Sequence, residues 1–143
     1  MISRWVTSAL LSALFAGLTA VFAKAGLGGV NADLATLVRT ALVLVCLFVV
    51  YTMLHGAPRP GVLGARAWLF LALSAAATAL SWLYYFRALQ AGPVAGVAAI
   101  DRASLLVAVC LAAAFLGERI TLRTLGGSVL VVVGVLLITL RGR

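Results

Sequence analysis

The amino-acid sequence predicts an all-α integral membrane protein with five transmembrane helices and no separate soluble domain. Of its 143 residues, 65% are hydrophobic and only 10% are charged, and the mean hydropathy is +1.23. Three acidic and eleven basic side chains are too few to cover so apolar a chain in water, so lipid must surround most of its surface. A membrane-spanning helix needs about 20 apolar residues, and runs suited to five such helices follow one another along the chain.

The first run covers residues 5–23 and is free of charge between Arg4 and Lys24. It is long enough to form the first membrane helix. Its last residues, Val21 to Ala23, also resemble a signal-peptide cleavage site, but the run exceeds the roughly 7 to 15 apolar residues of a typical signal peptide. We therefore interpret it as a retained helix, with cleavage as the alternative.

The second helix is predicted over residues 33–54, after a glycine-rich break. Asn31 or Asp33 can start it, because either side chain accepts hydrogen bonds from the free amides of a first helical turn. Arg39 lies inside this helix, and the uncharged run that follows it is too short to cross a bilayer alone. The sequence therefore places Arg39 within the membrane.

A connection rich in proline and glycine, residues 55–64, precedes a third helix predicted over residues 67–86. Trp82 and Tyr85 lie near the end of this helix, together with Tyr84. Aromatic residues in such a place are typical of the belt at a membrane interface, although their rings could also stack on an organic solute.

The fourth helix is predicted over residues 93–116, because proline is tolerated in a first helical turn and Gly92 and Pro93 interrupt the preceding helix. A short polar turn at residues 117–119 separates it from a fifth helix over residues 122–140. Five spans place the two termini on opposite sides of the membrane.

The basic residues outside or at the very ends of the five helices divide almost evenly between the two sides of the membrane. The side of the N-terminus holds Arg4, Arg59, Arg66, Arg119 and Arg123. The opposite side holds Lys24, Arg87, Arg141 and Arg143. Because an excess of Lys and Arg on one side sets the orientation, this division predicts insertion in both directions, with a weakly biased single topology as the alternative.

Three charged residues are predicted to lie at a similar depth in the membrane. At a rise of about 1.5 Å per residue, Arg39 lies about 9 Å below the surface opposite the N-terminus, and Asp101 and Arg102 lie about 12 to 14 Å below it. Charges in the hydrocarbon are costly and mark functional sites by default. We expect a basic, hydrated vestibule with Asp101 as its only deep acid, a structural ion pair between Asp101 and Arg39, or both.

Hydroxyl side chains form stripes on the first, third and fourth helices, and we expect these stripes to converge with Asp101 in one polar cavity. The candidate residues of this substrate or ion pathway are Asp101, Arg39, Arg102, Ser12, Thr19, Thr78, Ser81, Trp82, Tyr85 and Ser104. Serine and threonine in membrane helices also commonly bond to carbonyls of the preceding turn, which is the alternative interpretation of the stripes.

The sequence contains no residue pattern of an enzyme, a cofactor site or a metal centre. His55 is isolated, and the glycine-rich segments lack the phosphate-binding loop pattern of an ATP-driven pump. Cys46 and Cys110 are predicted to be free, buried thiols. The arginines are scattered as interface anchors and do not form a nucleic-acid-binding patch. The function classes that remain are a secondary transporter, a channel and a structural membrane subunit.

Several motifs, in order along the chain, resemble the EamA domain of the drug/metabolite transporter superfamily. They are Phe22-Ala23-Lys24 with Gly26, the stretch Tyr85-Phe86-Arg87-Ala88-Leu89-Gln90-Ala91-Gly92-Pro93, the stretch Phe115-Leu116-Gly117-Glu118-Arg119-Ile120, and Gly126-Gly127 with Val133-Gly134-Val135-Leu136-Leu137. The resemblance covers residues 1–143 as a single domain. It implies half of a ten-helix transporter with an inverted repeat.

The resemblance implies a secondary transporter or exporter of a small metabolite or drug-like solute in the cell (inner) membrane, working by alternating access. Most relatives carry two such domains in inverted orientation, so a single domain implies an antiparallel homodimer with the substrate path between its subunits. The alternative is a non-transporting membrane subunit, or a half-transporter that pairs with a paralogous chain. The first helix lacks the glutamate of the small multidrug-resistance proteins, so Asp101 would be the proton-coupled carboxylate.

Overall fold

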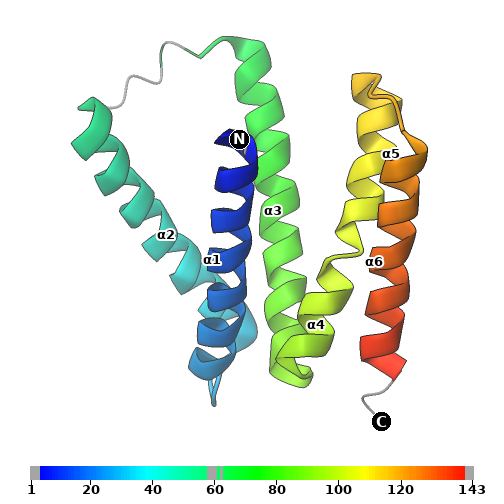
Figure 1. The fold of residues 1–143 in the computed structure, drawn as a ribbon. Helices are drawn as coiled ribbons and strands as arrows, with labels where there is room; N and C mark the ends of the chain where they lie inside the picture. Colours follow the sequence, from blue (N-terminus) through cyan, green and yellow to red (C-terminus); the bar gives the residue numbers. More distant parts are fainter. Residues whose placement is uncertain (1–3, 58–60, 62, 141–143) are drawn as a thin grey trace. The chain divides into compact units, whose positions relative to one another are not determined.

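The computed structural model describes residues 4–57, 61 and 63–140. Its helices are α1 (Arg4–Gly26), α2 (Ala32–His55), α3 (Ala65–Ala91), α4 (Val94–Asp101), α5 (Ser104–Leu116) and α6 (Leu122–Leu140), shown in Figure 1. With α4 and α5 counted as one stretch, five helices are long and apolar enough to cross a membrane. No strand occurs in the described residues. The predicted all-α, five-span class is confirmed.

Three basic residues used in the comparison of the two membrane sides, Arg59, Arg141 and Arg143, lie outside the described residues. Insertion in both directions therefore stays a prediction.

Two helices extend several residues beyond their predicted C-terminal ends. α1 continues past Lys24 to Gly26, and α3 continues to Ala91 rather than ending at residue 86. The extension of α3 carries Leu89, whose side chain is fully buried, so packing favours the helical conformation here. α3 then ends because proline at position 93 disfavours helical geometry in the residue before it.

Asn31 starts α2, which decides between the two cap residues that the sequence offered. Its side-chain oxygen accepts hydrogen bonds from the backbone amides of Asp33, at 2.8 Å, and Leu34, at 3.2 Å. These are two of the amides that a first helical turn leaves without carbonyl partners. The side chain of Asp33 is therefore free of the capping role.

The predicted fourth helix is interrupted at Arg102 and Ala103. The backbone amide of Arg102 donates to the carbonyl of Ala99, at 3.0 Å, and the amide of Leu105 donates to the carbonyl of Arg102, at 3.1 Å. These bonds span three residues in place of four, as in a 3₁₀ turn. The interruption lies beside the charged pair Asp101 and Arg102 and contains no glycine or proline, so the usual signals of a helix break are missing from the sequence.

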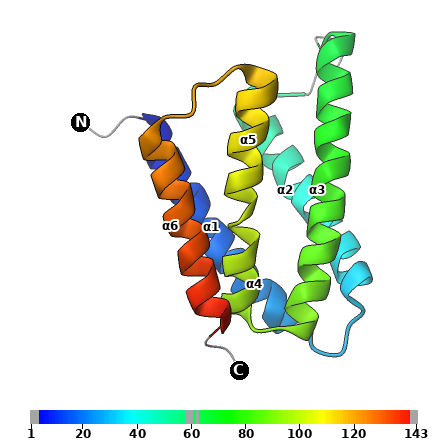
Figure 2. The same ribbon diagram turned by 90° about the vertical axis from the view of Figure 1, so that its right-hand side faces the viewer.

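The described contacts divide the chain into two compact units. One unit comprises Met1–Phe22 with Ala91–Arg143, and the other comprises Ala23–Gln90. In the first unit α4 packs against α6, and Figure 2 shows the two helices side by side. Ala99 of α4 and Ser128 of α6 are buried.

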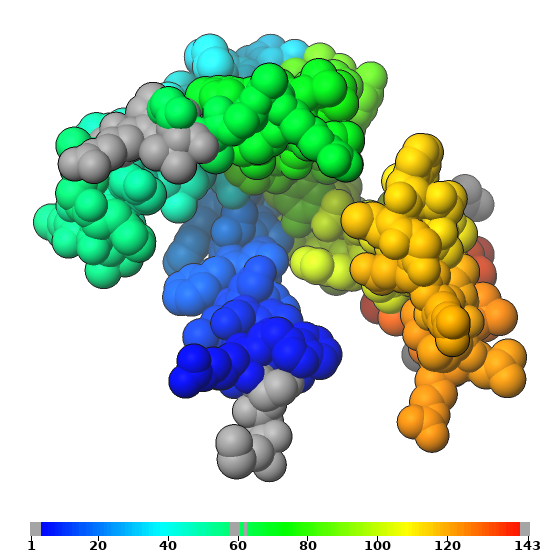
Figure 3. All heavy atoms as spheres, turned by 90° about the horizontal axis from the view of Figure 1, so that it is seen from above, coloured from blue at the N-terminus to red at the C-terminus, as the bar shows by residue number. Residues whose placement is uncertain are grey.

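A connection of residues 117–121 joins α5 and α6 in the same unit. Gly117 adopts the left-handed conformation, with φ at 68°, and the amide of Glu118 donates to the carbonyl of Ala112. This geometry is typical of a helix ended by glycine. Figure 3 shows the end of α5 in yellow and the start of α6 in orange, seen from above.

Most large apolar side chains of the described helices are exposed on the single chain. Leu122 is 88% exposed, Phe115 83% and Met53 82%, whereas only a few small or single large residues form a buried core. Water would oppose such exposure, but lipid tails do not. The distribution therefore fits a multi-pass protein whose helices meet lipid or further protein.

Candidate functional site

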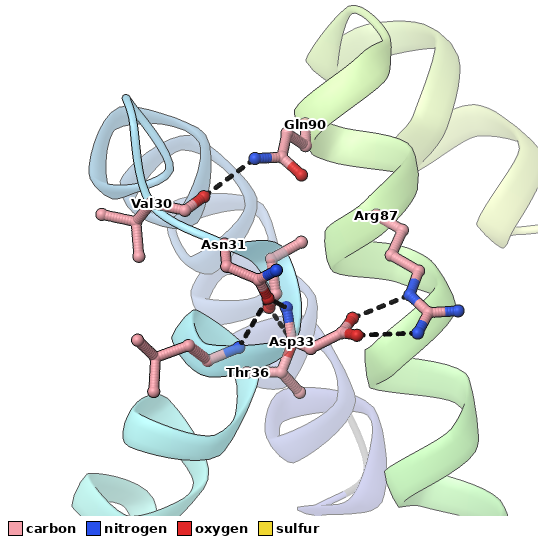
Figure 4. A network of polar contacts seen from close by, with 8 residues as sticks. Val30, Asn31, Asp33, Thr36, Arg87 and Gln90 are labelled. Carbon is pink, nitrogen blue, oxygen red and sulfur yellow. Dashed lines mark hydrogen bonds and ion pairs between the residues drawn. The ribbon is translucent and has the colours of Figure 1, made fainter.

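A polar network joins the start of α2 to the end of α3 (Figure 4). The guanidinium of Arg87 donates two hydrogen bonds to the carboxylate of Asp33, from Nε to Oδ1 and from Nη2 to Oδ2, both at 2.7 Å. The side-chain amide of Gln90 donates to the carbonyl of Val30, at 2.8 Å. A bidentate ion pair of this kind fixes orientation as well as distance, so the network sets how these two helix ends meet.

Lys24 joins the end of α1 to the same end of α3. Its ammonium group donates to the carbonyl of Leu89 and, at 3.5 Å, to the carbonyl of Gln90. The last carbonyls of a helix lack intrahelical donors and carry partial negative charge, so a cation is well placed there. Lys24 and Arg87 thus lie near one helix end, as the sequence predicts, and both are engaged by protein groups.

Arg39 is held between aromatic rings. Its guanidinium carbon lies 4.3 Å from the centre of the Trp82 ring and 5.6 Å from the centre of the Phe86 ring. Contacts of this kind stabilise a cation through the negative face of the ring. The Nη1 atom is buried, and within the described part of the chain no group accepts a hydrogen bond from it.

A cavity of about 310 Å³ adjoins Arg39 within the unit Ala23–Gln90. Its lining comes from the end of α1, Val30, the first half of α2 and Phe86 of α3, and among the described residues Arg39 is the charged member of that lining. Ligand pockets in proteins range over about 300–1,000 Å³ and are mostly apolar with a few polar groups. The cavity has this composition.

Trp82 of α3 contacts a charged side chain of α2. α3 continues to Ala91, so Trp82 lies about 13 Å from the end of its helix at a rise of about 1.5 Å per residue. Its ring contacts Arg39 of the neighbouring helix. The belt position of Trp82 stays a prediction, and the structure adds a contact between its ring and the guanidinium of Arg39.

The candidate pathway residues fall into both units. Arg39, Thr78, Ser81, Trp82 and Tyr85 belong to the unit Ala23–Gln90, and Ser12, Thr19, Asp101, Arg102 and Ser104 belong to the other. Of these residues the structure brings Arg39 and Trp82 into contact. The ion pair between Asp101 and Arg39 and the convergence of the three hydroxyl stripes stay predictions.

Asp101 and Arg102 flank the interruption between α4 and α5. Asp101 is half-buried, Arg102 is exposed, and Ser104 begins α5. Interrupted helices within membranes place backbone carbonyls and charged side chains where ions and substrates bind. The interruption therefore adds a structural reason to consider Asp101 a functional acid.

Some hydroxyl groups bond to their own helix. Thr78 donates to the carbonyl of Ser74, at 2.9 Å, and Thr36 donates to that of Ala32, at 2.8 Å. Ser8 and Thr40 make the same type of bond. For Thr78 this geometry supports the alternative interpretation, in which the hydroxyl is satisfied by the preceding turn.

Sequence reasoning missed the role of Asp33 and considered it only as a helix cap. Its partner, Arg87, lies 54 positions further along the chain. One feature of the sequence could have suggested this pair. The only acid near the start of α2 lies on the same predicted side of the membrane as a basic residue near the end of α3. Both side chains remain about half exposed, at 46% and 50%, so screening weakens the pair.

Exchanging the charges of this pair tests whether it holds α2 against α3. We expect Asp33→Arg and Arg87→Asp each to lower the melting temperature of the purified protein, because each places two like charges together. The double variant should recover most of the loss, and high salt should reduce all differences. Glu118→Arg, in the turn before α6, is the control. A double variant no more stable than either single variant would contradict the prediction.

Comparison with known proteins gives consistent results. The sequence matches the family described as "EamA-like transporter family" over residues 3–140. A protein of Sinorhizobium sp described as "Uncharacterized transporter in cobO 3'region" is 43% identical over 138 residues, which cover 96% of this chain and 98% of that protein. No solved structure matches the chain.

Proposed function

The chain belongs to the EamA-like transporter family, and from this premise we propose that it is a secondary transporter that moves a small metabolite or drug-like solute by alternating access. It is a multi-pass membrane transporter at the level of the family. The observation that carries the proposal is the match over residues 3–140, which includes all five spans. We further propose that it acts in the cell (inner) membrane.

The working form that we propose is an antiparallel homodimer. Many secondary transporters are built from two inverted repeats with the substrate site between them, and the five spans described here would supply one of the two. The relative from Sinorhizobium sp is matched over 98% of its own length, so it too has about the length of one set. Exposed apolar side chains on the described helices supply surface for such an association.

Transport by the purified chain alone tests this function. A stabilisation screen over amino acids, nucleosides and organic cations identifies a solute, and counterflow of that solute in liposomes then measures transport. We expect cross-linked dimers and saturable counterflow. A chain that forms no dimer and moves no solute, yet does both with a paralogous chain, would replace the homodimer by the half-transporter alternative.

Insertion in both directions has its own test. We expect reporters fused to the C-terminus to give signals on both sides of the membrane, because the basic residues hardly bias the orientation. Thr121→Arg adds one positive charge between α5 and α6 and should shift the ratio of the two signals. Thr121→Gln serves as the uncharged control at the same position. A signal on one side only, unchanged by the added charge, would reject dual insertion and favour a partner chain.

A further inference from the structure

We propose that Arg39 binds the acidic group of an amphipathic organic monoanion whose apolar body occupies the adjoining cavity. This inference deepens the proposed transport function and rests on it for its biological meaning, since it names a substrate class. It is carried by three observations within the unit Ala23–Gln90: a guanidinium without a carboxylate partner among the described residues, two aromatic rings that hold it, and an apolar cavity against it.

Arg39 differs from the neighbouring cationic side chains in the groups that it contacts. Arg87 is paired with the carboxylate of Asp33, and Lys24 donates to the carbonyls of Leu89 and Gln90. Arg39 has an electrostatic contact with ring faces, which accept no conventional hydrogen bond, and its buried Nη1 has no acceptor among the described residues. A buried cationic donor without an acceptor is costly, and a negative charge close to the guanidinium would offset part of that cost.

The aromatic rings give the guanidinium a defined orientation. The ring of Trp82 lies 4.3 Å from the guanidinium carbon and faces it, with Phe86 at 5.6 Å. The paired N–H groups that bind a carboxylate lie at the edge of the planar guanidinium, and the ring contacts restrict where that edge points. An arginine on a flexible, solvated side chain would lack this preorganisation, which lowers the entropic cost of binding.

The cavity determines the rest of the ligand. Apart from Arg39 its lining is apolar and includes Leu34, Val38, Leu42 and Phe86. A volume of about 310 Å³ lies near the lower end of the range for small-molecule sites. A hydrocarbon or aromatic body fits this lining, whereas a second polar group would be left without a partner there.

The single positive charge of Arg39 favours a ligand that carries a single negative charge. Arg39 is the one charged residue that lines the cavity, so an organic cation would meet a like charge in an apolar surrounding. A dianion would retain one uncompensated charge, which is costly in this setting. The preferred chemistry is therefore a monoanion, either a free aromatic or aliphatic carboxylate or the single negative charge of a lipid headgroup.

Binding to a protein with one tryptophan tests the site. In the variant Trp5→Phe with Trp68→Phe, fluorescence reports on Trp82 alone, because the sequence contains three tryptophans. We expect saturable quenching by phenylacetate in nanodiscs of phosphatidylcholine, and at least a tenfold weaker response to phenethylamine, which has a similar apolar body and a positive charge.

Arg39→Gln should weaken phenylacetate binding at least tenfold. Arg66→Gln should leave it unchanged, because Arg66 lies over Phe70, at 5.9 Å, outside this cavity. Ala35→Leu, which adds volume to the cavity lining while keeping Arg39, should also weaken binding and covers the case in which Arg39→Gln does not fold. Binding that is unchanged in the folded Arg39 or Ala35 variant would overturn the proposal.

A second arm separates the two sources of the anion. Nanodiscs that contain phosphatidylglycerol should compete with phenylacetate if the site takes a lipid headgroup, and have no effect if it takes a free carboxylate. If phosphatidylglycerol competes with phenylacetate in the unmodified protein but not in Arg39→Gln, the lipid headgroup is the ligand of the site. If neither anion binds through Arg39, the proposed site is overturned, even if the chain transports another solute. If an anion binds through Arg39 but no transport occurs, the proposed transport function is rejected and the site is retained.

Discussion

Replacing Asp101 by asparagine should reduce solute counterflow in liposomes to the background of empty vesicles while the folded yield stays close to that of the unmodified protein. Asparagine preserves the size of the side chain but cannot gain and lose a proton. If a proton or a cation drives the transport cycle, the cycle stops at the step in which the carboxylate changes its charge or its ion.

The distribution of the acids points to Asp101. The sequence contains three acidic residues; Asp33 is paired with Arg87 at the start of α2, and Glu118 lies in the turn between α5 and α6. Asp101 lies at the interruption inside the fourth span. An ionisable residue in that place is expensive to keep unless it serves a function.

Glu118→Gln is the matched control for this experiment, because it removes one negative charge from a turn at the end of a span. We expect it to retain counterflow. Full counterflow in Asp101→Asn, with an unchanged dependence on the external pH, would show that Asp101 does not couple an ion and would leave only a structural role for it.

The second large effect concerns which helices line the solute path. In a background without Cys46 and Cys110, which are free thiols, single cysteines at Ser12, Thr78 or Ser104 should react rapidly with a small, membrane-impermeant thiol reagent. A thiol ionises and reacts readily only where water reaches it. The solute should slow these reactions by occupying the path.

Val131 and Val132 of α6 provide the comparison. Both are half-buried in a run of apolar residues, so cysteines there should remain unreactive in lipid or in a dry helix contact. Exposure on the single chain does not distinguish water from lipid, but the reagent does. Equal labelling of the two sets would mean that the hydroxyl groups only satisfy backbone carbonyls, as Thr78 does with Ser74, and α1, α3 and α5 would no longer be assigned to the path.

The two cysteines themselves illustrate a limit of sequence reasoning. Both are free, as expected, but they are exposed on the chain rather than buried. The prediction treated an apolar neighbourhood in sequence as burial within the protein. In a membrane protein an apolar side chain can be satisfied by lipid, so hydropathy does not report which face meets another helix.

The five spans and the turns between them could be read from the sequence because they depend on local properties. A helix crosses a bilayer when about 20 residues are apolar, and Gly117, with its left-handed backbone, ends α5 where the glycine and the polar residues after it predict a turn. The extension of α3 to Ala91 could not be read in this way, because the burial of Leu89 is a property of the packed structure. The interruption at Arg102 also lacked the usual glycine or proline signal.

The candidate site shows the same division between what local sequence predicts and what tertiary packing decides. The sequence by itself identified Arg39 as a charge within the membrane, because hydropathy and helix length are sums over neighbouring residues. Only the tertiary structure decided that Arg39 lies over Trp82 and that Asp33 pairs with Arg87. Partner choice depends on the rotation and register of α2 against α3, to within a few ångströms, and side chains far apart in the sequence set that register together.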